Sequence, residues 1–310
     1  MASQKDVKNR IGSVKNIAKI TRAMEMVAAA RLRRAEQRIE ALRPYARAVR
    51  RMTRRTVEAA ENIPNLPLLE EHDNTNKVGL LLITGDRGLA GAFNSQILRA
   101  GNRRAQELKD EGKEVVWFAS GRRGVSSLQF RGREMAGNWA GFTDRPAFSN
   151  ARDIASEVAT QYVDEKVDRV EIVFNGYVSP LTQIVRTDVL LPLQDMAQLV
   201  AAAEEEADDD DDGEVDPSEE SGDIRGEWLY EPDPEAILAR LVPDFIEITI
   251  FRALLESTAS EHGARMTAMR NAQENATDMI EDLTLEMNRQ RQAEITQEIM
   301  EVVAGAEGLS

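Results

Sequence analysis

The most constraining feature of this sequence is a spacing of apolar and small residues that alternates between three and four along its N-terminal segment. The residues at this spacing form one continuous seam: Val7, Ile11, Val14, Ala18, Thr21, Glu25, Ala28, Leu32, Ala35, Ile39, Leu42, Ala46, Val49, Thr53 and Thr56. A 3.5-residue repeat held for about seven heptads is typical of a left-handed coiled coil. We expect Pro44 to kink this helix or to mark a local break, because proline lacks a backbone N–H. The spacing predicts a coiled-coil helix over residues 1–60.

The C-terminal segment carries the same alternation. Its seam reads Leu255, Ala259, His262, Met266, Met269, Gln273, Ala276, Ile280, Leu283 and Met287. Beyond Met287 the apolar positions shift to Ile295, Ile299 and Val302, so the register drifts near the end. The pattern predicts a second coiled-coil helix over 235–304, and a run of about 60 residues at about 1.5 Å per residue would be roughly 90 Å long.

Both seams mix small and polar residues with Leu, Ile and Met, so neither helix buries enough on its own to form a core. The simplest arrangement pairs the two terminal helices with each other, antiparallel, because the intervening segment returns the chain. The alternative is two separate amphipathic helices packed on a globule. We favour the paired rod because a globule rarely offers a flat face along so many heptads.

The middle of the chain is predicted to be an inserted, Rossmann-like α/β domain over 77–203. Four segments read as strands: Val78–Thr84, Glu114–Ser120, Arg169–Tyr177 and Gln183–Leu191. Two segments read as helices: Asn94–Glu111 and Ala151–Glu165. Alternating strands and helices of this kind indicate a small α/β domain inserted between the two long helices. The predicted fold class is therefore α/β plus a long coiled coil.

A glycine-rich stretch, ITGDRGLAGAFN, follows the first predicted strand and raises the question of a phosphate site. Its spacing, G-x-x-G-x-x-G, matches neither the dinucleotide fingerprint nor the phosphate loop, which needs a Lys-Ser/Thr pair. The turn from strand to helix accounts for the glycines, with Asp86 or Asn94 available as caps. We therefore expect no cofactor here.

The segment from Glu204 to Asp223 contains thirteen acidic residues and no basic one, and it predicts an acidic loop insertion over 204–226. Within it Asp208, Asp210, Asp212 and Glu219 fit the spacing of a calcium loop. The exiting helix is missing, however, because SGDIRG follows and Pro217 lies inside the loop. A poly-acidic segment meets this pattern easily by chance, so the calcium site is only an alternative to a loop without metal.

Charge and composition exclude several classes of function. Residues 1–60 carry a net charge of +11 against −15 for the whole chain, which leaves −26 on the remainder and opposes binding to nucleic acid. The chain has no cysteine and only two histidines, His72 and His262, and no serine elbow or carboxylate pair stands at usable spacing. No apolar run approaches the roughly 18 residues that span a bilayer, so we expect an intracellular chain without direct membrane insertion. We expect no catalytic residue.

Five stretches together identify a family: KNRIGSVKNIAKITRAMEMVAAARLRRA, ITGDRGLAGAFN, EWLYEPDP, ARMTAMRNAQENA and RQAEITQEIMEVVAGA. They closely resemble the gamma subunits of F-type ATP synthases, and the resemblance spans essentially the whole chain. It implies a rotating central stalk without catalysis of its own, which couples proton-driven rotation of the c-ring to ATP synthesis or hydrolysis. It implies alpha, beta and epsilon subunits and the c-ring as partners, and a peripheral location on the cytoplasmic face of the cell membrane.

The resemblance also assigns individual positions. Arg291, Gln292, Thr296 and Glu298 match the family's C-terminal contact with a catch loop of the beta subunit. Met24 and Arg265 match positions that couple helix packing to rotation. The acidic loop is longer and more acidic than is usual in the family, and one hypothesis is a brake that touches the c-ring or epsilon; unchanged ATPase and synthesis rates after deletion of 205–221 would refute it.

Overall fold

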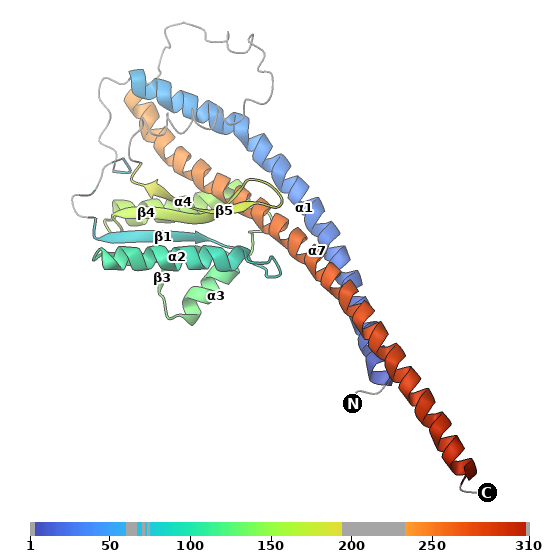
Figure 1. The fold of residues 1–310 in the computed structure, drawn as a ribbon. Coiled ribbons are helices and arrows are strands. Elements are labelled where there is room, and N and C mark those ends of the chain that lie inside the picture. The colour runs from blue at the N-terminus through green and yellow to red at the C-terminus, as the bar shows by residue number, and fades with distance from the viewer. Residues whose placement is uncertain (1–3, 60–66, 70–71, 73–74, 194–232, 308–310) are drawn as a thin grey trace, which may run out of the picture.

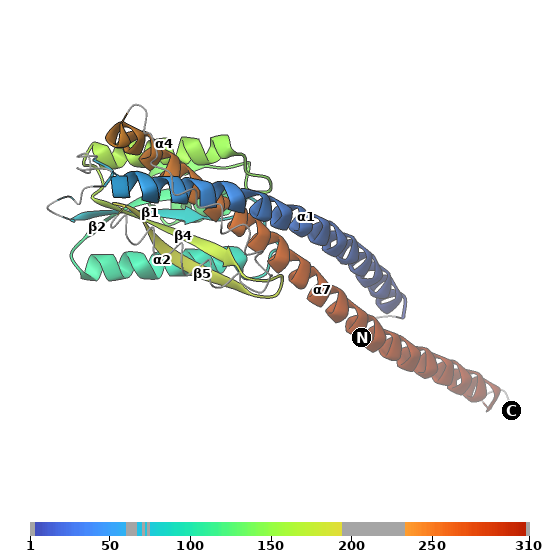
Figure 2. The same cartoon turned by 90° about the horizontal axis from the view of Figure 1, so that it is seen from above.

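The computed structural model describes residues 4–59, 67–69, 72, 75–193 and 233–307. Two long helices, α1 (Gln4–Ala59) and α7 (Pro234–Glu307), form a rod, and an α/β domain lies against one end of it (Figure 1). Helix α7 is 74 residues long and α1 is 56, and the C-terminal part of α7 extends past the N-terminus of α1. Figure 2 shows the same rod from above. The predicted fold class is confirmed.

Three apolar clusters along the rod establish that α1 and α7 are antiparallel. In order along α1 they are Val7, Ile11 and Val14 with Ala276 and Leu283, then Leu32 and Ala35 with Ala259, then Ala46 and Val49 with Ile248. The numbers rise along α1 while they fall along α7, as antiparallel packing requires. Every position of the predicted N-terminal seam is buried or half-buried. The alternative of two separate helices on a globule is therefore wrong.

Neither proline breaks its helix. Helix α1 continues through Pro44, and α7 continues through Pro243. Packing of Ala46 and Val49 against Ile248 holds α1 helical just beyond the proline, so tertiary contacts outweigh the lost backbone hydrogen bond. The break that we considered at Pro44 is not present.

The α/β domain contains a five-stranded sheet of order β3-β2-β1-β4-β5. The strands are β1 (Lys77–Ile83), β2 (Glu114–Ser120), β3 (Met135–Trp139), β4 (Arg169–Tyr177) and β5 (Gln183–Leu191). The first four are parallel, and β5 pairs antiparallel with β4. The helices are α2 (Phe93–Asp110), α3 (Arg122–Phe130) and α4 (Phe148–Val163).

The sequence analysis missed β3 and α3. Strand β3 is a five-residue edge strand whose burial alternates between half-buried and exposed, and its sequence, MAGNW, has little β propensity. Helix α3 has nine residues and begins after a glycine. Short elements at an edge give weak periodic signals, since the neighbouring strand rather than their own pattern stabilises them.

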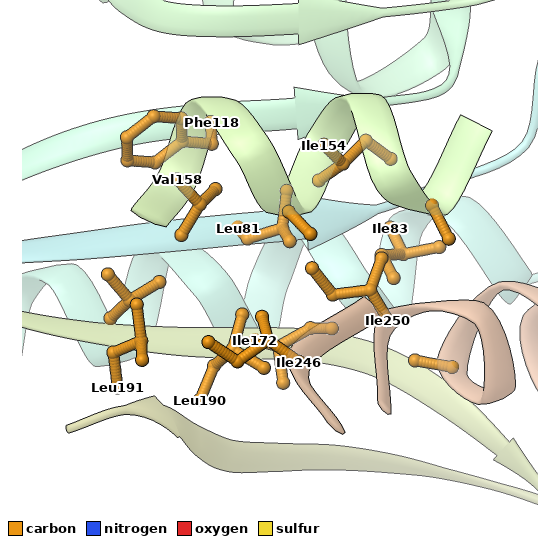
Figure 3. Packing of buried hydrophobic residues seen from close by; sticks show 14 of the residues in the cluster. Leu81, Ile83, Phe118, Ile154, Val158, Ile172, Leu190, Leu191, Ile246 and Ile250 are labelled. Atoms are coloured by element: carbon orange, nitrogen blue, oxygen red, sulfur yellow. The ribbon is translucent and has the colours of Figure 1, made fainter. Parts of the chain in front are cut away.

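The sheet separates two cores, and α7 contributes to one of them. Leu81 and Ile83 of β1 face α4 and α7, whereas Leu80 and Leu82 face α2. Figure 3 shows Ile246 and Ile250 of α7 packed in the first core. Helix α7 is thus one half of the rod and also one layer of the α/β domain.

Candidate functional site

Helix α7 fills the crevice in which doubly wound sheets normally hold a ligand. That crevice lies beyond the carboxyl ends of the strands where the strand order reverses, here between β1 and β4. Ser260 of α7 donates a hydrogen bond to the carbonyl oxygen of Asn175 in β4 (3.2 Å). Gly85, two residues after β1, lies against the carboxylate of Glu261 on α7. The place of a bound ligand is taken by the chain's own helix.

The glycines of the β1–α2 turn serve this close approach. A Cβ atom on Gly85 would lie 2.7 Å from the Glu261 carboxylate, and one on Gly88 would lie 2.8 Å from a guanidinium nitrogen of Arg123. The Gly85 amide donates to Asn94 Oδ1 (2.9 Å), so this donor is already engaged. The Asp86 amide likewise donates to Thr143 Oγ1 (2.8 Å). Amides that could hold a phosphate are used to shape the turn and bind it to neighbouring loops.

Asp86 joins the turn to the segment after β3. Its carboxylate accepts hydrogen bonds from the amides of Arg122 (2.9 Å), Gly141 (2.9 Å) and Thr143 (3.1 Å). Burial acts to raise the pKa of Asp86, but these hydrogen bonds outweigh it and hold the pKa below its ordinary value. A fixed carboxylate in the turn makes the crevice unfavourable for phosphate.

Three loops surround the middle of α7, and we call them the collar: the turn 84–92, the segment 140–147 and the hairpin 178–182. Thr258 donates to the carbonyl oxygen of Thr143 (2.9 Å) in the second loop. A Cβ atom on Gly263 would lie 3.0 Å from the carbonyl oxygen of Pro180 in the third. All residues of α7 from Ala253 to Gly263 are buried. The collar holds α7 from several sides.

A chain of buried polar groups runs through the collar. Arg265 donates to the carbonyl oxygen of Gly88 (3.3 Å) and to the carboxylate of Glu261. Another nitrogen of Arg265 lies 3.3 Å from Nδ1 of His262. The exposed fractions are small: 2% for Glu261, 1% for His262 and 8% for Arg265. Unpaired charge at this depth would be costly, so these contacts must be satisfied together.

The chain continues from His262 to helix α1. Nε2 of His262 lies 3.6 Å from Oδ1 of Asp144, which belongs to the collar. Asp144 is in turn the acceptor for the guanidinium of Arg31 on α1. Contacts between side chains of α1, the collar and α7 are therefore continuous.

Burial sets the protonation of this chain. Desolvation, followed by the nearby Arg265, lowers the pKa of His262 to about 4, so the imidazole is neutral at pH 7. Desolvation raises the pKa of Glu261 above its ordinary value, although Arg265 opposes the shift. Helix α1 also contacts the domain through a hydrogen bond from Tyr177 to Glu36 and one from Arg38 to the carbonyl oxygen of Pro146.

The predicted site residues lie in three places. Arg265 lies on α7 and contacts the collar at Gly88, and Met24 is half-buried on α1. Arg291, Gln292, Thr296 and Glu298 lie on the projecting end of α7, where every residue from Arg291 to Val303 is exposed. We call this stretch, 291–303, the tip. Its Ile295, Ile299 and Val302 are 48%, 57% and 72% exposed, and their spacing of four and three residues places them on one face of the helix, which forms an apolar strip that a partner can cover.

The candidate calcium positions lie outside the described residues. Within the described part of the chain, no cluster of three or more His, Asp or Glu residues is arranged to hold a metal ion. In the same part, no helix combines the length and apolar character needed to cross a membrane.

Sequence reasoning missed Glu261 and Asp144. A faint signal for Glu261 exists, since it stands four residues before Arg265, a spacing that pairs opposite charges on a helix. Asp144 gives no local signal, because its partners on α1 and α7 are distant in the sequence.

The fold and the tip define a class of stalk protein. In this class a shaft of two paired helices carries an α/β domain packed against one end, and a single exposed helix extends from the other end. The family model described as ATP synthase matches residues 3–309. The ATP synthase gamma chains of Rubrobacter xylanophilus and Moorella thermoacetica are each 39% identical to this chain. Both alignments cover 100% of this chain, and they cover 99% of the Rubrobacter protein and 100% of the Moorella protein. The chain belongs to the ATP synthase gamma chain family, which confirms the resemblance noted in the sequence.

Solved structures agree in fold. A chain of the Euglena gracilis mitochondrial ATP synthase superposes with a TM-score of 0.63 at 16% identity, covering 99% of this chain and 94% of that one. A chain of the Tetrahymena thermophila central stalk and c-ring has a TM-score of 0.58 at 24% identity and covers 82% and 99%. The rod with its clamped domain is thus a shared architecture.

Proposed function

We propose that this chain is the rotating central stalk of an ATP synthase and contributes no catalytic group of its own. The observation that carries the proposal is the tip of α7, which extends beyond α1 with apolar and polar side chains all exposed. A bare helical end of this kind needs a surrounding partner, and the family supplies the ring of alpha and beta subunits.

The stalk acts through contact energy. A ring of identical beta subunits around an asymmetric shaft meets a different face of that shaft at each position. A partner can shift a conformational equilibrium only by as much as its affinity differs between the conformations. Rotation of the shaft therefore moves each beta subunit in turn through its binding states.

The opposite end of the molecule carries the clamped α/β domain, and we propose that it faces epsilon and the c-ring. The complex would then lie peripherally on the cytoplasmic face of the cell membrane, with proton flow turning the ring. The basic excess of residues 1–60 suits acidic surfaces of beta, and its attraction will weaken as salt rises.

Arg291, Gln292, Thr296 and Glu298 are the proposed contacts to beta. Arg291 offers a planar guanidinium for two parallel hydrogen bonds to a carboxylate, and Gln292 offers both a donor and an acceptor. The hydroxyl of Thr296 bonds to the carbonyl oxygen of Gln292 (2.8 Å), so it is oriented along the helix. Met24 and Arg265 are proposed to act through the rod rather than by touching beta.

Copurification with alpha and beta subunits tests the proposal. The tagged chain should elute with both, and Arg291→Ala with Gln292→Ala should lower ATPase activity of the complex by about tenfold, from the loss of one charge-assisted contact. Gln297→Ala is the matched control, since Gln297 is exposed on the same helix and lies on the face opposite the four proposed contacts. Elution of the wild-type chain without alpha and beta would refute the assignment.

A further inference from the structure

We propose that His262 is a positioning residue that ties helix α1 and the collar to Arg265, so that rod and α/β domain turn as one body. The inference rests on the proposed function for the torque, but the contact itself is a property of this chain. His262 is 1% exposed and lies where α1, α7 and the collar meet.

The two ring nitrogens have different tasks. Arg265 is always a donor, so Nδ1, at 3.3 Å from its guanidinium, must be the acceptor. Nε2 then carries the hydrogen, and it lies 3.6 Å from the Asp144 carboxylate. The Asp144 backbone also contacts the ring and favours its hydrogen-bond donor. This tautomer satisfies both neighbours at once, and only a neutral imidazole can adopt it.

Protonation would destroy the arrangement. A cationic His262 would lose its acceptor towards Arg265 and would be repelled by the guanidiniums of Arg265 and Arg31. The Asp144 carboxylate favours the cation, but burial and the two guanidiniums outweigh it. The low pKa of His262 agrees with a site built for the neutral ring.

The position of this contact gives it mechanical importance. The pair of Arg31 and Asp144 is about one-third exposed on each side, so alone it is a weak link between α1 and the domain. His262 joins this pair to Arg265, which holds both Glu261 and the turn carbonyl of Gly88. A sideways force on the rod is therefore transmitted to two loops of the collar, at Asp144 and Gly88, and not through one surface ion pair alone.

Three variants of the full chain test the role. His262→Phe keeps the volume and removes both polar contacts, whereas His262→Gln retains a donor for Asp144 and an acceptor for Arg265. His72→Phe is the matched control: His72 stacks on Tyr162 with ring centroids 4.4 Å apart and lies 3.3 Å from Asp168, which accepts a hydrogen bond from the Lys77 amide at the end of β1 opposite the collar. It therefore loses an imidazole–carboxylate contact without touching the collar.

Hydrogen exchange of the isolated chain gives the first measurement. In His262→Phe, amides of 84–92 and 140–147 should exchange about tenfold faster, which corresponds to one lost buried hydrogen bond to a charged group. His262→Gln should restore most of the protection, and His72→Phe should leave these amides unchanged. Equal exchange in wild type and His262→Phe would overturn the proposal.

The assembled ATP synthase gives the second measurement, protons pumped per ATP hydrolysed. His262→Phe should lower this ratio at least about twofold while hydrolysis continues, and His262→Gln should restore it. If the histidine had only a structural role, its loss would reduce assembly but would leave the ratio of the assembled enzyme unchanged. An unchanged ratio in His262→Phe would refute the mechanical role. If the wild-type chain itself fails to assemble, the proposed function fails instead, and the exchange result still decides the contact.

Discussion

Two glycines of the α/β domain, Gly121 and Gly132, differ in how much space their backbone positions leave for a side chain. Gly121, which precedes α3, has φ = 96°, and a Cβ atom there would lie 2.0 Å from the carbonyl oxygen of Thr84. Gly132 has φ = 65° but has nothing within 4 Å of its Cβ position. Both positions have a positive φ, but Gly121 also has ψ = 134°, outside the left-handed helical region that alanine can enter, so the two positions differ in strain as well as in space.

Gly121→Ala and Gly132→Ala therefore compare a strained and crowded glycine position with an open one that also has a positive φ. Gly132→Ala should cost about 1–2 kcal/mol in the free energy of unfolding, the usual penalty of a left-handed alanine. Gly121→Ala should cost more than about 4 kcal/mol, because the β1–α2 turn must also move. Urea denaturation measures both, and equal losses would show that close approach to Thr84 is unimportant.

His262 makes stability depend on pH. Its pKa falls from 6.5 to about 4 on folding, so the unfolded chain binds the proton more readily. The stability that it contributes is present above about pH 6.5 and is lost as pH falls towards 4, by about 2 kcal/mol between pH 7 and pH 5. The measurement is urea denaturation of wild type and His262→Gln at both pH values.

The difference between those two proteins isolates the histidine. Glu261 has a raised pKa and acts with the opposite sign, since its contribution is lost as pH rises, but it is present in both chains. A wild-type curve parallel to that of His262→Gln would contradict the assigned pKa of His262.

At the scale of elements, the rod depends on its seam and not on its outer face. Leu32 is 4% exposed and packs with Ala35 and Ala259, whereas Ile17 on the same helix is 53% exposed. Leu32→Ala should lower the free energy of unfolding of the isolated chain by about 2–4 kcal/mol. Ile17→Ala should change it by less than about 0.5 kcal/mol. Similar losses at the two positions would show that the pairing in solution differs.

The tip of α7, in contrast to the buried seam of the rod, is not needed for folding. Residues 291–303 are exposed throughout, so a chain that ends at Gln290 loses few contacts among the described residues. The shortened chain should keep its thermal midpoint within about 2 °C and lose affinity for alpha and beta subunits. Calorimetry and copurification check the two halves, and loss of folding would show that the tip packs back on the chain.

At the scale of the whole molecule, one helix sets the length. The 74 residues of α7 at about 1.5 Å each make a body roughly 110 Å long. Small-angle scattering of the isolated chain should give a maximum dimension near or above that value. A value near that of a sphere of equal mass would show that the rod folds back.

Much of this architecture could be predicted from sequence because it is local or periodic. The seam from Val7 to Thr56 follows from a helix that keeps one face towards its partner. Strands β4 and β5 occupy the residues predicted for them, since apolar and β-branched runs between turn residues specify strands locally. The β3 and α3 elements escaped because neighbours stabilise them.

The sequence by itself determined the two long helices, their pairing, the alternating α/β insertion and the family. Only the tertiary structure decided what the glycine turn holds: helix α7 enters the crevice of the sheet, and Arg265 meets a carbonyl 177 positions away along the chain. The contact from Arg31 to Asp144 spans 113 positions. Such contacts leave no periodic trace, because they depend on where separate elements meet in space and not on the spacing within any one of them.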